Sequence, residues 1–238
     1  METSVINYDA NGMKAVGLLA VPDGNDKRPG VLVCHEGPGL GRHVKDVTIR
    51  IAEELGFVAF ALDYIGDGEV LAGMPEVMAR LGPLMADPLK TRAIGEAGLG
   101  VLTANDRVDT SRLAAIGYCF GGTMSLELAR GGTDLKAVVG FHSGLSTARP
   151  QDASAITGKV LVCIGTEDPI VPPDQRAAFE VEMRDGGVDW RMNLYGGAAH
   201  SFTNPEAGGL GIPGIEYHDL TNRRSWAAML DLFDETLG

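Results

Sequence analysis

Positive charge is scarce in this sequence. The chain has 20 lysine and arginine residues against 32 aspartate and glutamate residues, so its formal net charge is -12 and its isoelectric point is near 4.8. Nucleic acids and anionic membranes are bound through basic surfaces that displace counterions. We therefore expect neither of them as a partner, and we interpret the excess acid as a solvated surface.

Long hydrophobic runs are also missing. No apolar run approaches the roughly 18 residues that cross a bilayer, and residues 1–5 contain no basic segment of the signal-peptide type. These features predict a soluble, cytoplasmic protein. The 238 residues are enough to bury a sizeable core, and no repeat, low-complexity tract or Pro/Ser-rich linker divides them. We expect one domain over residues 1–238.

Cysteine is rare, with three residues in the chain. Cys34, Cys119 and Cys163 cannot all pair with one another, and their spacing fits no zinc motif, so no metal site is expected. Cys34 and Cys163 lie in apolar runs and are interpreted as small core residues. A reducing environment suits all three.

The apolar pattern predicts an α/β fold, with a mostly parallel, twisted sheet covered by helices on both faces. Short β-branched runs alternate with longer segments of helical periodicity, as is typical of parallel sheets. Strands are predicted at 30–35, 57–62, 113–118, 136–141, 159–165 and 189–195, with an edge strand at 13–21 that ends at Pro22. Helices are predicted at 44–55, 75–84, 91–103, 121–130, 174–186 and 216–237.

Three segments have no regular pattern, namely 63–75, 83–90 and 196–215. Irregular stretches in a compact domain are either binding loops and lids or simply mobile. The last predicted helix carries an apolar face, formed by Leu220, Trp226, Met229, Leu230 and Phe233.

Residues 117–122 read Gly-Tyr-Cys-Phe-Gly-Gly, between an apolar run and a stretch of helical pattern. A strand, a glycine-framed nucleophile and a helix follow one another in this order in the Gly-x-Ser-x-Gly nucleophile elbow, here with Cys119 in place of serine. Gly117 and Gly121 are expected to permit backbone conformations that a Cβ opposes, and Gly122 to let the helix approach the sheet. The helix N-terminus favours a thiolate. The alternative is a buried cysteine beside ordinary turn glycines.

A cysteine nucleophile needs a base and a carboxylate that orients the base. Asp168 and Glu167 follow the strand at 159–165, and His200 follows the strand at 189–195. The elbow fold uses the same chain order of nucleophile, acid and histidine. His142 is the alternative base. Either acid alone also fits an ordinary turn.

The remaining histidines have simpler interpretations. His43 and His218 stand in polar helical contexts and are expected at the surface, whereas His35 stands at a strand end and is expected to order a loop.

The loop after the strand at 30–35 lies where the elbow fold places its second oxyanion donor. Gly37 N–H is the candidate, together with Phe120 N–H, and two such donors lower the barrier by several kcal/mol. Glu36 is unusual here. Its carboxylate would raise the pKa of a nearby thiol, or accept its proton and hold it unreactive. A solvated loop glutamate is the alternative.

With these features in place, the chain resembles the dienelactone hydrolase family of the α/β-hydrolase fold. The resemblance extends over about residues 13–237 and is carried by segments 31–36, 109–122, 165–169 and 200–202. It implies a Cys119–Asp168–His200 triad, in which Asp168 rather than Glu167 precedes the Pro-Ile-Val-Pro turn, and a Glu36 that restrains the resting thiol until substrate displaces it. It also implies cleavage of lactones and activated esters through a thioester, without metal or organic cofactor.

The chain departs from this family after the histidine. Dienelactone-cleaving members have an arginine there that grips the substrate carboxylate, and this chain has Asn204. Arg80 matches a second family arginine, or is a solvated helix residue. An apolar set near the expected rim either packs a core or lid, or forms a pocket wall suited to uncharged aryl or alkyl groups. Its members are Met74, Met78, Leu84 and Met85.

The sequence therefore predicts a cysteine-dependent hydrolase of activated carboxylic esters or lactones. One alternative is a promiscuous aryl phosphotriester hydrolase that uses the same residues, because a neutral site with a soft nucleophile also suits a tetrahedral phosphorus. Another is a non-hydrolytic reactive-thiol or ligand-binding protein. We expect a small-molecule substrate and a monomer or homodimer.

Overall fold

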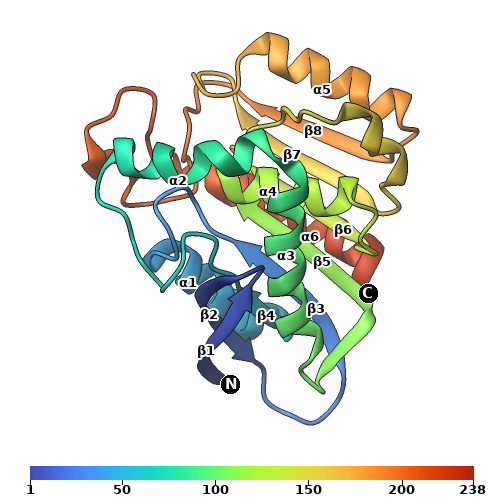
Figure 1. Ribbon diagram of the computed structural model, residues 1–238. Helices are drawn as coiled ribbons and strands as arrows, with labels where there is room; N and C mark the ends of the chain where they lie inside the picture. Colours follow the sequence, from blue (N-terminus) through green and yellow to red (C-terminus); the bar gives the residue numbers. More distant parts are fainter.

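An eight-stranded sheet runs through the protein (Figure 1). The computed structural model describes the backbone of residues 1–238 and every side chain except that of Leu210. The strands are β1 (Glu2–Ala10), β2 (Met13–Val21), β3 (Arg28–Cys34), β4 (Val58–Ala61), β5 (Val108–Tyr118), β6 (Ala137–Phe141), β7 (Lys159–Gly165) and β8 (Trp190–Tyr195). Their order in the sheet is β1-β2-β4-β3-β5-β6-β7-β8. The pairs from β4 to β8 are parallel, which confirms the predicted α/β fold.

Helices cover both faces of this sheet (Figure 1). They are α1 (Arg42–Arg50), which a π-helical turn at Ile51–Leu55 continues, α2 (Met74–Ala86), α3 (Pro88–Thr103), α4 (Phe120–Arg130), α5 (Pro173–Asp185) and α6 (Asp219–Leu237), with short 3₁₀ turns at Pro150–Ala155 and Ala207–Leu210. In β3, Val31 and Val33 face the core under α1 and α6, whereas Leu32 and Cys34 face the core under α2 to α5. Both faces are buried, which explains the continuous apolar runs of the central strands. Among the described residues, no helix is both long and apolar enough to cross a membrane.

The N-terminal edge of the sheet differs from the prediction. The strand at 13–21 forms as β2, but β1 lies outside it and pairs with it in an antiparallel hairpin. The turn is Asn11-Gly12, with φ of 58° and 84°. Positive φ at both residues is the geometry of a type I′ turn, for which Asn-Gly is the strongest short signal.

The junction at 83–90 is helical, which contradicts the predicted irregular segment. Helix α2 continues through Pro83 to Ala86, and α3 begins at Pro88, where the first turn of a helix tolerates proline. The Asp87 carboxylate caps α3 by accepting hydrogen bonds from two backbone N–H groups in its first turn. The expected apolar face of the last helix is also incomplete, because Leu220 is exposed.

The glycines of the elbow are required for close approach, and not for the backbone freedom that we expected. Gly117, Gly121 and Gly122 all lack a positive φ, whereas Cys119 itself has φ 55° and ψ -121°. A Cβ on Gly117 would overlap the Gly121 carbonyl, one on Gly121 would overlap the Cys34 and His35 carbonyl oxygens, and one on Gly122 would overlap the Ser143 hydroxyl. Helix α4 therefore lies directly against the ends of β3, β5 and β6.

This packing predicts opposite effects of the same substitution at two glycines. Gly117→Ala should lower the free energy of unfolding by at least about 1–3 kcal/mol, because the backbone of α4 must move. Gly100→Ala, at an exposed position of α3 where a Cβ meets nothing within 4 Å, should raise it by about 1 kcal/mol. Chemical denaturation of both variants measures the difference, and equal stabilities would contradict the close approach.

Candidate active site

The register of the parallel strands brings five chain segments to one edge of the sheet. Cys34 pairs with Gly117, Tyr118 with Phe141, Phe141 with Cys163, and Gly165 with Tyr195. The residues that follow these strands consequently emerge side by side at the carboxyl edge, where ligands of such sheets bind.

Cys119 lies at the sharp turn between β5 and α4. Its N–H donates to Phe141 O at 3.0 Å, and its own carbonyl accepts the Gly122 N–H at 3.1 Å. Its positive φ is rare for a residue with a Cβ and costs of order 1–3 kcal/mol. The surrounding glycine contacts hold the turn in this conformation, and the side chain stays partly exposed. This is the geometry of a nucleophile elbow.

His200 and Asp168 lie in contact at the same edge. His200 Nδ1 donates to Asp168 Oδ2 at 2.8 Å, and Asp168 Oδ1 accepts the backbone N–H groups of Ile170 and Val171 at 2.8 and 3.2 Å. Both side chains are almost fully buried. Glu167 is exposed and bonds to Thr166, so Asp168 is the acid that meets the histidine.

The other ring nitrogen of His200 faces Cys119. Nε2 is buried and has no acceptor at hydrogen-bonding geometry among the described residues. Burial of the ring disfavours its charged form, but the negative charge of a Cys119 thiolate and the hydrogen bond to Asp168 outweigh burial and raise the pKa of His200 to about 10.

The two candidate oxyanion donors, Phe120 N–H and Gly37 N–H, belong to α4 and to the loop after β3. Phe120 is the first residue of α4, so its N–H has no partner within the helix. Gly37 N–H donates to no acceptor among the described residues. A Cβ on Gly37 would come within 2.9 Å of Val77 and 3.2 Å of Leu81, so α2 packs directly onto this loop.

Glu36 does not contact Cys119 within the described part of the chain. Its Oε1 accepts a hydrogen bond from His43 Nδ1 at 2.8 Å and another from Asn204 Nδ2 at 3.2 Å. Burial disfavours the carboxylate, but its bonds and charge interactions with His43, His35 and Asn204 outweigh burial and lower its pKa. The expected contact between Glu36 and the thiol is absent because α1 and the 203–206 loop hold the carboxylate.

The surface location expected for His43 is wrong, since its side chain is 9% exposed and packs edge-on against Tyr118. One sequence feature could have indicated that His43 pairs with Glu36. His43 follows Glu36 by seven residues, across a turn rich in glycine and proline. His218 is half-buried and caps α6, where its Nδ1 accepts the Thr221 N–H.

His35 and His142 are buried and neutral. His35 donates to Glu36 O at 2.6 Å and stacks on Tyr64, and burial lowers its pKa to about 4. It thus orders the loop, as expected. His142, the alternative base, has its Nε2 2.8 Å from Thr203 Oγ1, and burial lowers its pKa well below the usual range. It packs against His200, and among the described residues its ring hydrogen-bonds to no carboxylate.

The Arg80 guanidinium has its hydrogen-bond partners in the loop before α2. It donates to Ile65 O and to the Glu69 carboxylate, each at 3.2 Å, and is half exposed. The guanidinium is therefore engaged by the 63–75 loop.

A cavity of about 350 Å³ borders the first turn of α4. Leu84 and Met85 line it, whereas Met74 and Met78 lie outside it and are about half exposed. Its other walls are Pro88, Thr91, Phe120, Thr123, Glu127, Gly144, Ser146, Thr147, Ala148, Ile170 and Gln175. The one charged member, Glu127, has its carboxylate bound by Arg92 and Arg130. The wall therefore offers no free cation.

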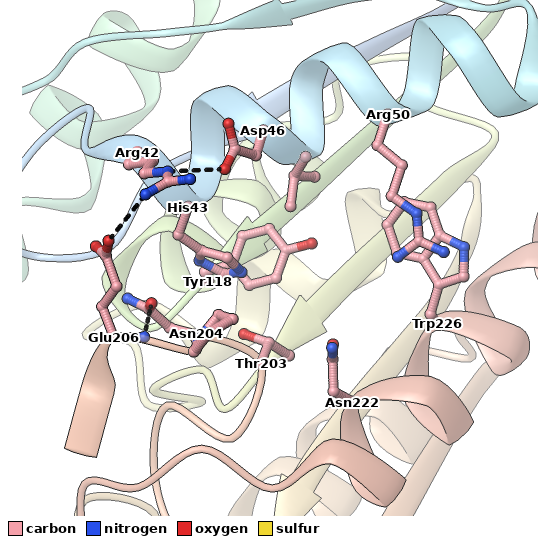
Figure 2. A pocket seen from close by; sticks show the side chains of 12 residues that line it. Arg42, His43, Asp46, Arg50, Tyr118, Thr203, Asn204, Glu206, Asn222 and Trp226 are labelled. Atoms are coloured by element: carbon pink, nitrogen blue, oxygen red, sulfur yellow. Dashed lines mark hydrogen bonds and ion pairs between the residues drawn. The ribbon is translucent and has the colours of Figure 1, made fainter. Parts of the chain in front are cut away.

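A second cavity, also of about 350 Å³, lies between α1, the 203–206 loop and α6 (Figure 2). Its walls include His43, Tyr118 and Asn204, and Arg42 bridges Asp46 and Glu206 at its rim. Two of its lining residues, His43 and Asn204, are the ones that hold Glu36.

No group of three or more His, Cys, Asp or Glu side chains suited to a metal ion occurs among the described residues.

Comparison with known proteins identifies a family. A sequence model of the dienelactone hydrolase family matches residues 15–237. The protein usf of Aquifex pyrophilus is 30% identical over 209 residues, which cover 84% of this chain and 87% of that protein.

Two solved structures are similar over the whole chain. One, named m3DLH, has a TM-score of 0.96 at 44% identity and covers 100% of this chain and 99% of its own. The other is a dienelactone hydrolase-like promiscuous phosphotriesterase from metagenomic libraries, with a TM-score of 0.94 at 39% identity and the same coverage.

The charge balance around His200 predicts how its pKa responds to loss of the sulfur. In Cys119→Ala, loss of the interactions with the sulfur should lower the pKa of His200 from about 10, because burial then opposes only the interactions with Asp168. NMR titration of the labelled imidazole measures this change. Cys163→Ala, which removes a buried cysteine in β7, is the matched control and should leave the pKa unchanged. An unchanged pKa in Cys119→Ala would show that the sulfur does not raise the pKa of His200.

Proposed function

Because the chain belongs to the dienelactone hydrolase family, we propose that it is a hydrolase of activated carboxylic esters or lactones that uses Cys119 as its nucleophile. The observation that carries this proposal is the contact of His200 Nδ1 with Asp168, which leaves the opposite ring nitrogen facing the cysteine at the elbow. These groups supply a nucleophile, a proton carrier and an orienting acid.

The first half of the reaction forms a thioester. The Cys119 thiolate attacks the carbonyl carbon, and the π electrons move to the oxygen, which the N–H groups of Phe120 and Gly37 stabilise as an oxyanion. When the carbonyl re-forms, the bond to the alcohol oxygen breaks. His200 Nε2 donates its proton to this leaving oxygen and becomes neutral.

The second half of the reaction regenerates the enzyme. Neutral His200 takes a proton from water as the water oxygen attacks the thioester carbonyl. The same two N–H groups stabilise the new oxyanion, whose collapse expels the Cys119 thiolate and leaves the acid product. Asp168 holds the ring in one orientation in both steps and stabilises its charged form.

The neutral cavity supports uncharged substrates. It borders Phe120, which follows the nucleophile, and Ile170, whose N–H binds the acid of the His200 pair. Its walls carry no free cation, and Asn204 stands where dienelactone-cleaving relatives carry an arginine. A substrate carboxylate would be desolvated there without a charged partner. Aryl and alkyl esters or uncharged lactones fit better.

A second activity is supported by a specific likeness. The promiscuous phosphotriesterase is 39% identical and superimposes over the whole chain. The same thiolate and oxyanion donors suit a tetrahedral phosphorus with an aryl leaving group, and a neutral cavity accepts its uncharged ester groups. We propose aryl phosphotriesters as further substrates, with paraoxon as the test compound.

Substitution of the nucleophile tests the mechanism. Cys119→Ala should lower kcat for p-nitrophenyl esters by about ten-thousand-fold or more, because no other group forms the thioester. Cys163→Ala should retain activity. Turnover that survives in Cys119→Ala would refute the mechanism, and a wild-type protein that is alkylated but hydrolyses no ester, lactone or phosphotriester would favour the non-hydrolytic alternative.

The substrate panel tests the neutral cavity. The values of kcat/KM for uncharged aryl esters and lactones should exceed that for the carboxylated dienelactone, because the carboxylate finds no cation in the cavity wall. A preference for the carboxylated lactone would contradict this expectation.

Substitution of two methionines on α2, one inside the cavity and one outside it, tests whether the substrate occupies this cavity. Met85→Ala should raise KM for aryl esters about fivefold with little change in kcat, because an apolar contact of about 1 kcal/mol is lost. Met78→Ala removes an equally exposed side chain outside the cavity and should leave both constants unchanged. Equal effects on KM would place the substrate elsewhere.

A further inference from the structure

Two hydrogen bonds converge on a single oxygen of Glu36. His43, from α1, donates to Oε1 at 2.8 Å, and Asn204, from the loop after His200, donates at 3.2 Å. The side chains of Glu36 and His43 are 12% and 9% exposed. A carboxylate held by two donors in this setting has one preferred orientation.

The His43 ring is itself held in place by packing. It meets Tyr118 edge-on, with 4.8 Å between ring centroids, and Tyr118 directly precedes Cys119. Figure 2 shows His43 and Asn204 on the same side of the second cavity, with Tyr118 beside the histidine. We call His43 and Asn204, the two residues that donate to Glu36, the clamp. It is built from α1 and the 203–206 loop and is supported by Tyr118 of β5.

Glu36 and Cys119 are neighbours by topology. Cys34 and Gly117 are partners in adjacent parallel strands, and each of the two side chains stands two residues beyond its partnered position. The first turn of α4 touches the carbonyl groups of Cys34 and His35. A Glu36 side chain released from the clamp would therefore share the carboxyl edge with the sulfur.

We propose that His43 is a positioning residue that holds Glu36 turned toward α1, so that no free carboxylate lies beside the Cys119 sulfur before substrate binds. The inference rests on the proposed function in taking Cys119 as the reactive sulfur. A free, ionised Glu36 would repel a Cys119 thiolate or accept a hydrogen bond from the intact Cys119 S–H group, and either effect favours the unreactive thiol. The clamp prevents both.

The test compares two replacements of His43 by a direct readout of the sulfur. His43→Phe keeps an aromatic ring against Tyr118 and removes the donor, whereas His43→Asn places an amide N–H near the position of Nδ1. Iodoacetamide alkylation of Cys119, followed by mass spectrometry across a range of pH, reports thiolate without any substrate turnover. His43→Phe should lower the alkylation rate at pH 7 about tenfold and shift its profile to higher pH, and His43→Asn should restore most of the rate.

A double variant distinguishes loss of the hydrogen bond to Glu36 from a general disturbance of the fold. In the double variant His43→Phe/Glu36→Gln the charge that would disturb the sulfur is gone, so the alkylation rate should return toward that of wild type. Lys45→Ala, at an exposed position of α1, is the control for changes to this helix and should leave the rate unchanged. Thermal unfolding of each variant checks that it is folded.

The outcomes distinguish this inference from the proposed function. An unchanged alkylation profile in His43→Phe, or a slow rate that Glu36→Gln does not rescue, would overturn the role of His43 whether or not Cys119 hydrolyses esters. Retained ester turnover in Cys119→Ala would refute the hydrolytic mechanism while leaving the alkylation result intact.

Discussion

The close approach of α4 to the sheet is the constraint on which the rest of the site depends. The backbone of the helix lies against β5 and the end of β3 so tightly that no Cβ fits at Gly117 or Gly121. This contact holds Cys119 at φ 55°, a conformation that an isolated chain would avoid. It also places the helix N-terminus, with its unpaired N–H groups, beside the sulfur. Local strain at one residue is thus offset by packing spread over three strands.

Electrostatics at the site contrasts with the strongly acidic surface of the protein. Beside the cysteine, the described acids are all engaged: Asp168 by His200 and two backbone N–H groups, and Glu36 by His43 and Asn204. Burial lowers the pKa of His35 and of His142, so both rings are neutral. Burial also disfavours the charged form of His200, but the pKa of this ring is nevertheless raised. The interactions of this ring with Cys119 and Asp168 together outweigh burial and raise its pKa.

Sequence reasoning predicted those features that local patterns determine. The parallel strands were evident because burial on both faces makes each a continuous apolar run, and Asp168 and His200 could be placed at one edge because each directly follows such a strand. Strand β1 was missed because its buried and exposed residues alternate and it forms no continuous apolar run. The Asn11-Gly12 turn nevertheless indicated a hairpin. The pairing of His43 with Glu36 was missed because it depends on how the turn at 37–41 redirects the chain, which no periodicity encodes.

Asn204 affects both the charge offered to a ligand and the position of Glu36. The Asn204 side chain has no positive charge to bind a substrate carboxylate. Its amide instead donates a hydrogen bond to the Glu36 carboxylate. His43 and Asn204 both donate to Glu36 in the protein without a ligand. If the proposed function is correct, a ligand does not have to move this carboxylate, and the choice of substrate depends on the shape and apolar character of the cavity beside α4.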